Sequence, residues 1–124
     1  MYTAAVITVS DKGAAGQRED EGGPLVGRML RGAGYDVVHT AVVPDEQAQI
    51  EAELISCADT LGVALTVTTG GTGFSPRDIT PEATLAVCTR MAPGIGEAMR
   101  AAGLSVTNRA MLARQQAGIR GRTL

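Results

Sequence analysis

The first strand-forming run of this chain is apolar almost throughout, and no other feature constrains the fold as strongly. Residues 2–10 have the sequence Tyr-Thr-Ala-Ala-Val-Ile-Thr-Val-Ser, which is rich in β-branched side chains. A strand with one face in water alternates polar and apolar residues, whereas a strand covered on both faces does not. We therefore expect this run to lie in a sheet between two layers of helices, as in α/β proteins.

Strands and helices are expected to alternate along the rest of the chain. One helix is predicted from Pro24, at a typical first helical position, to a C-cap at Gly34. Asp45 is an N-cap candidate for the next helix, and Thr80-Pro81 repeats this signal. The expected strands are residues 2–10, 35–43 and 63–69, the expected helices are residues 24–33, 46–61, 80–90 and 95–102, and residues 11–23 are expected to form a loop. This order predicts a three-layer α/β/α fold around a mostly parallel, Rossmann-like sheet.

The composition limits the class of protein. The chain of 124 residues is long enough for one domain with a real core, and 44% of its residues are hydrophobic. Eleven basic and thirteen acidic residues give a net charge of −2, so neither nucleic acid nor an anionic membrane is an expected partner. The N-terminus lacks a charged region followed by an apolar stretch, which indicates a cytoplasmic protein.

Few side chains are available for soft-metal or nucleophilic chemistry. Cys57 and Cys88 are expected to be small buried hydrophobic residues. Two cysteines and one histidine do not supply the four softer ligands of a structural zinc site. His39 falls in the middle of a predicted strand, so we expect an exposed or edge side chain. Neither this position nor the spacing of glycines around Ser75 fits a serine hydrolase.

Polar loops follow the three predicted strands, at the edge of a parallel sheet where ligands bind. They are Ser10-Asp11, Pro44-Asp45 and residues 70–80. The third loop begins Thr69-Gly70-Gly71-Thr72-Gly73, and its glycines allow backbone N–H groups to approach an anion without obstruction by a Cβ atom. The alternative is a tight turn that only needs positive φ angles. The loop has neither the glycine spacing of dinucleotide-binding enzymes nor the lysine of P-loop NTPases, so both classes are excluded.

Two carboxylates are expected near this glycine loop. Asp45 and Asp78 each follow a strand end by a few residues, and two such groups facing a phosphate-binding loop form a hard-oxygen site suited to Mg²⁺. The alternative is that Asp45 caps a helix and Asp78 is a turn residue. Arg77 is placed to pair either with a phosphate or with a neighbouring acid.

Five segments of the chain form a recognisable set. The most distinctive is residues 68–84, Thr-Thr-Gly-Gly-Thr-Gly-Phe-Ser-Pro-Arg-Asp-Ile-Thr-Pro-Glu-Ala-Thr. The others are Val9-Ser10-Asp11, Pro44-Asp45-Glu46-Gln47, Pro93-Gly94-Ile95-Gly96-Glu97-Ala98-Met99-Arg100 and Ala117-Gly118-Ile119-Arg120-Gly121. Together they closely resemble the MogA/MoaB family of molybdenum-cofactor biosynthesis, the molybdopterin adenylyltransferases. The match spans essentially the whole chain in the family's order, which makes it far more specific than the glycine loop alone.

The resemblance implies transfer of AMP from ATP to the terminal phosphate of molybdopterin, with Mg²⁺ and with release of pyrophosphate. It also implies a homotrimer or homohexamer and a downstream protein that inserts molybdenum. By this resemblance, Asp45 and Asp78 are the catalytic carboxylates and organise the metal ion. The residues implied to bind the nucleotide and its phosphates are Thr69, Gly70, Gly71, Thr72 and Gly73, and those implied to border the pterin and nucleotide cleft are Ser10, Asp11, Ser75, Arg77 and Glu97.

The chain departs from the family pattern in two places. Ala113 stands where relatives usually have the serine of Met-Leu-Ser-Arg, a hydroxyl associated with pterin binding. The printed sequence ends at Leu124, where the family continues into a strand, a loop and a final helix, so we expect residues 1–124 to be a single MogA/MoaB-like domain without those elements. Two alternatives stay open: a catalytically silent MoaB-like molybdopterin-binding protein, which Ala113 favours, and a competence-damage-type nucleotide-processing domain, which the segment after the glycine loop disfavours.

Overall fold

The apolar N-terminal run forms the central strand of a sheet in the computed structural model, which describes residues 1–124. This strand, β1 (Thr3–Val9), has residues 4–7 at most 1% exposed. It is flanked by β2 (Asp36–Val43) and β3 (Leu65–Thr69), and both neighbours run parallel to it in the order β2-β1-β3. The predicted parallel sheet with a strand buried on both faces is therefore confirmed.

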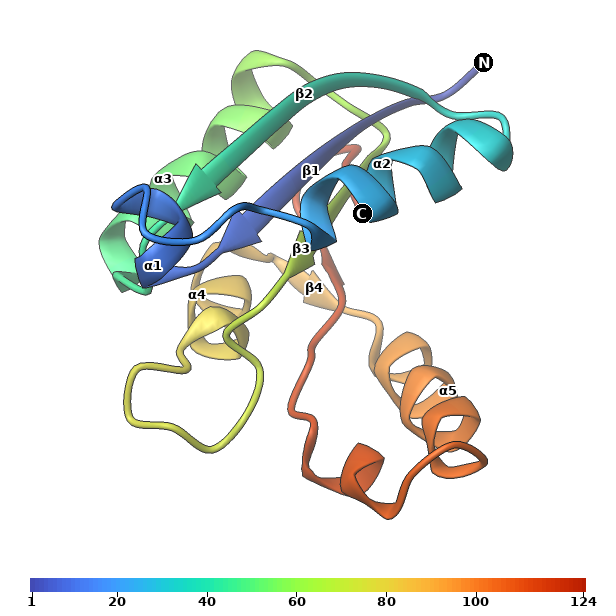
Figure 1. Ribbon diagram of the computed structural model, residues 1–124. Coiled ribbons are helices and arrows are strands. Elements are labelled where there is room, and N and C mark those ends of the chain that lie inside the picture. The colour runs from blue at the N-terminus through green and yellow to red at the C-terminus, as the bar shows by residue number, and fades with distance from the viewer.

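Helices cover both faces of this sheet (Figure 1). On one face, α2 (Gly22–Gly32) packs against β1 and β2. On the other face lie α3 (Gln47–Ile55), its continuation as the π-helical turn η1 (Ser56–Thr60), and α4 (Thr80–Val87). The predicted three-layer α/β/α arrangement is confirmed.

The main core lies between the sheet and the layer formed by α3, η1 and α4. Its buried members are Ala5, Ile7, Val9, Ile50, Cys57, Val63 and Ala83. Burial of a side chain as large as Ile7 or Ile50, both fully buried, contributes about 1.5–3 kcal/mol. This packing fixes α3 and α4 against the sheet and so fixes the loops that lead into them.

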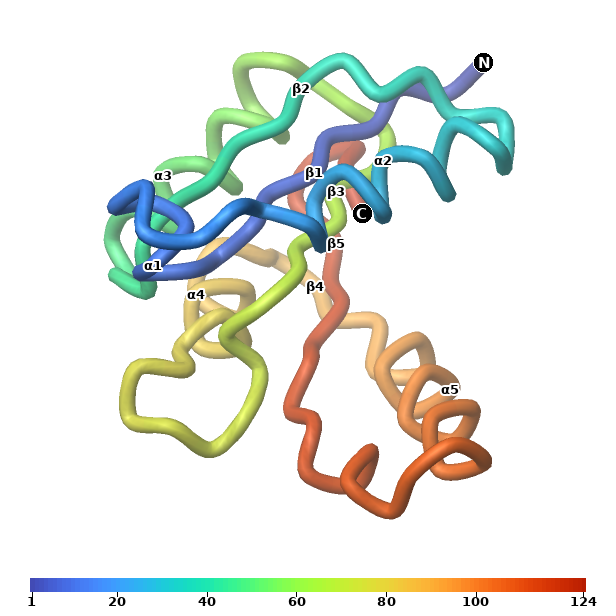
Figure 2. Tube along the Cα trace, in the orientation of Figure 1, coloured from blue at the N-terminus to red at the C-terminus, as the bar shows by residue number.

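The remaining elements lie at the ends and edges of the sheet. They are α1 (Asp11–Ala14), β4 (Arg90–Met91), α5 (Pro93–Leu104), η2 (Asn108–Leu112) and β5 (Gly118–Ile119), and β4 and β5 pair antiparallel. Figure 2 shows α5 and η2 as an arm that extends away from the body of the fold. No helix in the structure combines the length and the apolar character needed to cross a membrane.

The segment predicted as a loop, residues 11–23, is partly helical. Ser10 caps the single turn of α1, because its side-chain oxygen accepts a hydrogen bond from the N–H of Gly13. The helix predicted from Pro24 begins two residues earlier at Gly22, where the Asp20 carboxylate accepts the Gly23 N–H at 3.0 Å.

The predicted bounds of the helix at residues 80–90 are also wrong. We expected it to continue to Arg90, but α4 ends at Val87 because Arg90 pairs with Ile119 between β4 and β5. Ile79, not Thr80, precedes its first turn. The hydroxyl of Thr80 is used elsewhere, as a donor to the carbonyl of Gly70.

Candidate active site

The three strands of the sheet end at one level, so the loops after them meet. Val9 is paired with Val43, and Thr8 is paired with Thr69. The first residue after β1 already touches the end of β2, since the Ser10 N–H donates to the carbonyl of Val43 at 2.8 Å. The sheet edge predicted to hold the site therefore brings all three loops together.

Asp11 and Asp45 join the first two loops by a reciprocal pair of hydrogen bonds. The Asp11 N–H donates to Asp45 Oδ2 at 2.9 Å, and the Asp45 N–H donates to Asp11 Oδ1 at 3.0 Å. The expectation that Asp45 is the N-cap of the next helix is wrong, because Glu46 occupies that position and no side chain caps the helix. The carboxylate of Asp45 is held at the end of the sheet instead.

Arg77 ties the third loop to the other two. Its guanidinium donates to both carboxylate oxygens of Asp11, at 3.0 and 2.8 Å, and to Glu46 at 3.0 Å. These hydrogen bonds, with that from the Asp45 backbone, hold the pKa of Asp11 below its ordinary value. Of the two partners predicted for Arg77, the structure contains the neighbouring acids.

The glycine loop has its carbonyls bound and its N–H groups free. Thr80 donates its hydroxyl to the carbonyl of Gly70 at 2.9 Å and its N–H to the carbonyl of Gly71 at 3.1 Å. Arg114 donates its N–H to the carbonyl of Thr72 at 2.9 Å and its Nε–H to the carbonyl of Gly73 at 2.8 Å. None of the N–H groups of residues 70–74 donates a hydrogen bond within the chain. A run of free N–H groups of this kind is an anion-binding arrangement.

The glycines of this loop are needed for two reasons. Gly70 and Gly71 have φ angles of +102° and +69°, which L side chains rarely adopt, so the tight-turn explanation holds for both. Gly71 and Gly73 also lie against carboxylates: a Cβ atom would stand 3.1 Å from Asp45 Oδ1 at Gly71 and 2.9 Å from Asp78 Oδ2 at Gly73. The glycines therefore allow both the positive φ angles of a tight turn and a close approach of the backbone to Asp45 and Asp78.

The carboxylates form a negatively charged cluster. Burial raises the pKa of Asp45 above its ordinary value, and the charges of Asp11 and Asp78 raise it further. Asp78 is fixed within its own loop, where its Oδ2 accepts the Ser75 N–H at 3.1 Å. Oxygen ligands of this type are preferred by Mg²⁺, and a cation would relieve the mutual repulsion. The donor set therefore fits the predicted metal ion.

A polar cleft of about 730 Å³ opens over these residues. Nine of the twelve predicted site residues line it: Ser10, Asp11, Asp45, Thr69, Gly70, Gly71, Ser75, Arg77 and Asp78. Thr72 and Gly73 continue the glycine loop beyond the lining, and Glu97 lies on α5, outside this cleft. Phe74, next to Gly73, is 70% exposed.

Sequence reasoning missed one segment that lines the cleft. Lys12, Arg18 and Asp20 all line it, and neither Lys12 nor Arg18 belongs to any of the five ion pairs of the structure. The available signal was that Lys12 is the only lysine and directly follows the loop at the end of β1. Two cations without an ion-pair partner therefore line the same cleft as the glycine loop.

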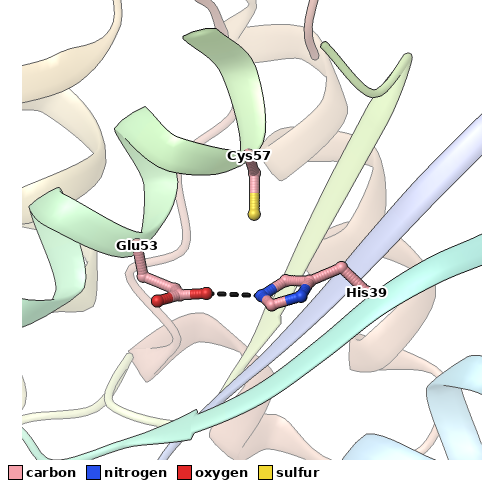
Figure 3. Close-up of side chains that lie close together, drawn as sticks. All are labelled: His39, Glu53 and Cys57. Carbon is pink, nitrogen blue, oxygen red and sulfur yellow. Dashed lines mark hydrogen bonds and ion pairs between the residues drawn. The ribbon is translucent and has the colours of Figure 1, made fainter. Parts of the chain in front are cut away.

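A second cluster of potential ligands lies apart from this site, between β2 and α3 (Figure 3). His39, Glu53 and Cys57 each place one ligand atom within 4.8 Å of the others. His39 Nε2 and Glu53 Oε1 are only 2.6 Å apart, a hydrogen-bond distance, whereas two ligands of one tetrahedral zinc ion stand about 3.3 Å apart. Cys57 is buried as predicted, and burial raises the pKa of its thiol. The cluster is accounted for by a hydrogen-bonded His39–Glu53 pair beside a core thiol.

Comparisons with known proteins agree on one family. The family model described as "Probable molybdopterin binding domain" matches residues 5–123. A molybdopterin adenylyltransferase of Haemophilus influenzae is 44% identical over 126 residues, which cover 100% of this chain and 64% of that protein. Another, of Helicobacter pylori, is 43% identical, and the match covers 96% of this chain and 69% of that protein. The crystal structure of the molybdopterin biosynthesis enzyme MoaB of Thermus thermophilus matches with a TM-score of 0.94 and 44% identity, over 100% of this chain and 78% of that one.

Proposed function

Because this chain belongs to the molybdopterin-binding domain family that includes these adenylyltransferases, we propose that it is a molybdopterin adenylyltransferase. In the proposed reaction an oxygen of the terminal phosphate of molybdopterin attacks the α-phosphorus of ATP. The bond from that phosphorus to the β-phosphate breaks, so AMP is transferred and pyrophosphate leaves. We assign this activity to residues 1–124 as a single domain, which spans 64% of the length of the Haemophilus relative.

The observation that carries the proposal is the orientation of the glycine loop beside the carboxylate cluster. N–H groups of residues 70–74 have no acceptor within the chain, and Gly71 lies directly against Asp45. Free N–H groups bind phosphate oxygens, while carboxylates repel them unless a cation stands between. Both features at one sheet edge suit a phosphate–metal complex better than they suit a neutral ligand.

Asp45 and Asp78 are the residues that would hold Mg²⁺, and their oxygens match its ligand preference. When bound, the metal supplies charge neutralisation at the phosphate oxygens. The protein's own part is positioning: the reciprocal Asp11–Asp45 pair keeps the carboxylate at the strand end, and the Ser75 N–H keeps Asp78 in its loop. Holding the reactants in line in this way supplies much of the rate of group transfer.

Lys12 and Arg18, which line the cleft, are proposed to bind the triphosphate. Both are free of carboxylate partners, unlike Arg77, which is held by Asp11 and Glu46. A free cation binds a phosphate without first breaking an ion pair. These side chains therefore suit the developing charge of pyrophosphate better than Arg77 does.

The deciding experiment is an incubation of the protein with ATP, Mg²⁺ and molybdopterin. The expected result is stoichiometric formation of pyrophosphate and adenylylated molybdopterin, measured by chromatography and mass spectrometry. Omission of molybdopterin is the control, and it should abolish pyrophosphate release. Binding of molybdopterin without any pyrophosphate would refute the proposal.

A silent molybdopterin-binding protein is the second candidate, and Ala113 is the observation that favours it. The residue carries no hydroxyl, is half-buried, and stands one position before Arg114, behind the glycine loop. In this candidate the carboxylate cluster would be intact but the pterin would be held in an unreactive position. The same incubation distinguishes the two, because a silent protein binds without turnover.

We also propose a homotrimer or homohexamer that passes its product to a molybdenum-insertion protein in the cytoplasm. Apolar side chains on the arm formed by α5 and η2 support an assembly. Met99 is 56% exposed, Val106 85% and Met111 63%. Light scattering coupled to size-exclusion chromatography would give the number of subunits, and a mass of one chain would refute the assembly.

A further inference from the structure

Arg114 lies behind the glycine loop and contacts three parts of it. Its N–H donates to the carbonyl of Thr72, its Nε–H to the carbonyl of Gly73, and its Nη2 to the carbonyl of Asp78 at 2.8 Å. Glu82, in the first turn of α4, accepts two further hydrogen bonds from the guanidinium at 2.8 and 3.1 Å. One side chain thus links the glycine loop, the backbone of the proposed catalytic residue Asp78 and a helix.

We propose that Arg114 is a positioning residue for adenylyl transfer, which sets the orientation of the glycine loop and of Asp78 without touching substrate. This inference rests on the proposed function of the loop. Arg114 does not line the polar cleft. Four of the five N–H bonds of its guanidinium already meet acceptors of the protein, so little is left for a phosphate.

The geometry of the peptide bond explains how Arg114, which binds carbonyls of the loop, orients the N–H groups that point to the other side. In a trans peptide the C=O and the following N–H point in opposite directions. Thr80 binds the carbonyls of Gly70 and Gly71, and Arg114 binds the next two. Each bound carbonyl turns the next N–H to the opposite side. Thr80 therefore orients the N–H groups of residues 71 and 72, the first half of the anion site, and Arg114 orients those of residues 73 and 74, the second half.

Apart from Arg114, the contact that attaches the second half of the loop to the rest of the protein is the binding of the Arg77 side chain to Asp11 and Glu46. Residues 74–77 are all exposed, so packing does not fix them. Within the loop, Asp78 and Ser75 bond only to each other, through Asp78 Oδ2 and the Ser75 N–H and through the Asp78 N–H and the Ser75 carbonyl. Without the Arg114 guanidinium the loop keeps this internal turn and the backbone bond to the carbonyl of Thr72, but it loses the hydrogen bonds at the carbonyls of Gly73 and Asp78.

A lysine would not replace this arginine. The guanidinium is a rigid planar fork that reaches acceptors on two sides, whereas an ammonium group is a point charge at the end of a flexible chain. The charge itself is already balanced by Glu82, whose pKa Arg114 holds below its ordinary value. We therefore expect geometry rather than charge to decide the effect of substitution.

The chain contains a matched control in Arg120. Like Arg114, it is about one-third exposed, forms a 2.8 Å ion pair with a carboxylate, Asp59, and donates to a backbone carbonyl, that of Val87. It lies outside the polar cleft and does not contact the glycine loop. Arg120→Met therefore removes a comparable set of contacts far from the proposed chemistry.

The test compares Arg114→Lys, Arg114→Met and Arg120→Met with the parent protein. For both Arg114 variants we expect kcat of AMP transfer to fall about 10²-fold, the effect of a displacement of about 1 Å, with a smaller change in KM for ATP. We also expect faster hydrogen exchange, in the protein without ligands, of the amides of Thr80 and of residue 114, which donate to the loop carbonyls of Gly71 and Thr72. Arg120→Met should lower the melting temperature similarly but keep kcat and the exchange of these two amides.

Three results would overturn the inference. They are a kcat within about twofold of the parent in a folded Arg114→Met protein, an equal loss of kcat in Arg120→Met, and full recovery in Arg114→Lys. If Arg114→Met does not fold, Arg114→Lys, which keeps the charge and the alkyl chain, carries the comparison. If the parent itself transfers no AMP, the proposed function fails, and the exchange measurement alone then decides whether Arg114 orders the loop.

Discussion

Replacement of Asp45 by Asn separates the contribution of a charge from that of a shape. The amide keeps the size of the carboxylate, and its oxygen accepts the Asp11 N–H as Asp45 Oδ2 does at 2.9 Å. The variant therefore preserves the link between the loops after β1 and β2. It removes one negative charge from the cluster that Asp45 forms with Asp11 and Asp78.

This change should lower the rate of AMP transfer but should not lower the stability of the fold. Removal of one preorganised electrostatic group at a reaction centre typically costs about 10²–10³ in kcat, or about 2.7–4 kcal/mol, so we expect a loss of at least about 10²-fold. Folding stability should not fall. Folding raises the pKa of Asp45 above 3.8, so its ionised form opposes folding at neutral pH and stops doing so as the pH falls below that value.

The assay pairs single-turnover rates of AMP transfer at saturating Mg²⁺ with melting temperatures at about pH 7 and about pH 3, above and below the ordinary pKa of an aspartate. Asp45→Asn should be slow, should melt no lower than the parent at neutral pH, and should lose any advantage in stability in acid. Asp78→Asn should show the same loss of rate. A near-normal rate in either variant would reduce that carboxylate to a structural role, and a lower melting temperature of Asp45→Asn at neutral pH would refute the electrostatic argument.

Three further changes test other parts of the site. Gly71→Val places a Cβ atom against Thr80 and Asp45 at a φ of +69°, so ATP affinity measured by calorimetry should fall sharply, and unchanged affinity in a folded variant would remove the loop from the site. Ala113→Ser should tighten molybdopterin by about 0.5–1.5 kcal/mol in an equilibrium titration, while an unchanged Kd would mean that this position does not face the pterin. Arg77→Gln should raise the pKa of the Asp11 carboxyl, followed by NMR, because Arg77 is the main cause of its low value; an unchanged pKa would show that the ion pair does not persist in solution.

Periodicity and composition predicted the sheet because burial leaves a direct mark on sequence. The apolar run of β1 marks a strand covered on both faces, and the predicted centre of the fold is confirmed. Helix ends were predicted less well, since tertiary partners decide them. Gly22 is helical because Asp20 binds the next amide, and Arg90 is not helical because it pairs with a strand far along the chain.

The site was predicted where it depends on strand ends and missed where it depends on long-range hydrogen bonds. Asp45 and the glycine loop follow strands directly, so the parallel sheet alone places them at one edge. The partners of Asp45 and Gly73 are Asp11 and Arg114, which are 34 and 41 positions away in the chain. No local pattern encodes pairs at such separations. Lys12 and Arg18 were missed for another reason, since neither forms an ion pair and residues 11–23 were predicted to be only a loop.

The exposed ring of Phe74 makes the glycine loop unusually convenient to observe. The chain has no tryptophan, and Phe74 is its only phenylalanine, 70% exposed next to Gly73. A Phe74→Trp protein would therefore carry a single indole fluorophore against a background of two tyrosines, placed on the loop rather than in the core. Because the side chain is largely exposed, the emission of that one indole would report loop motion and nucleotide arrival in real time above the background of the two tyrosines.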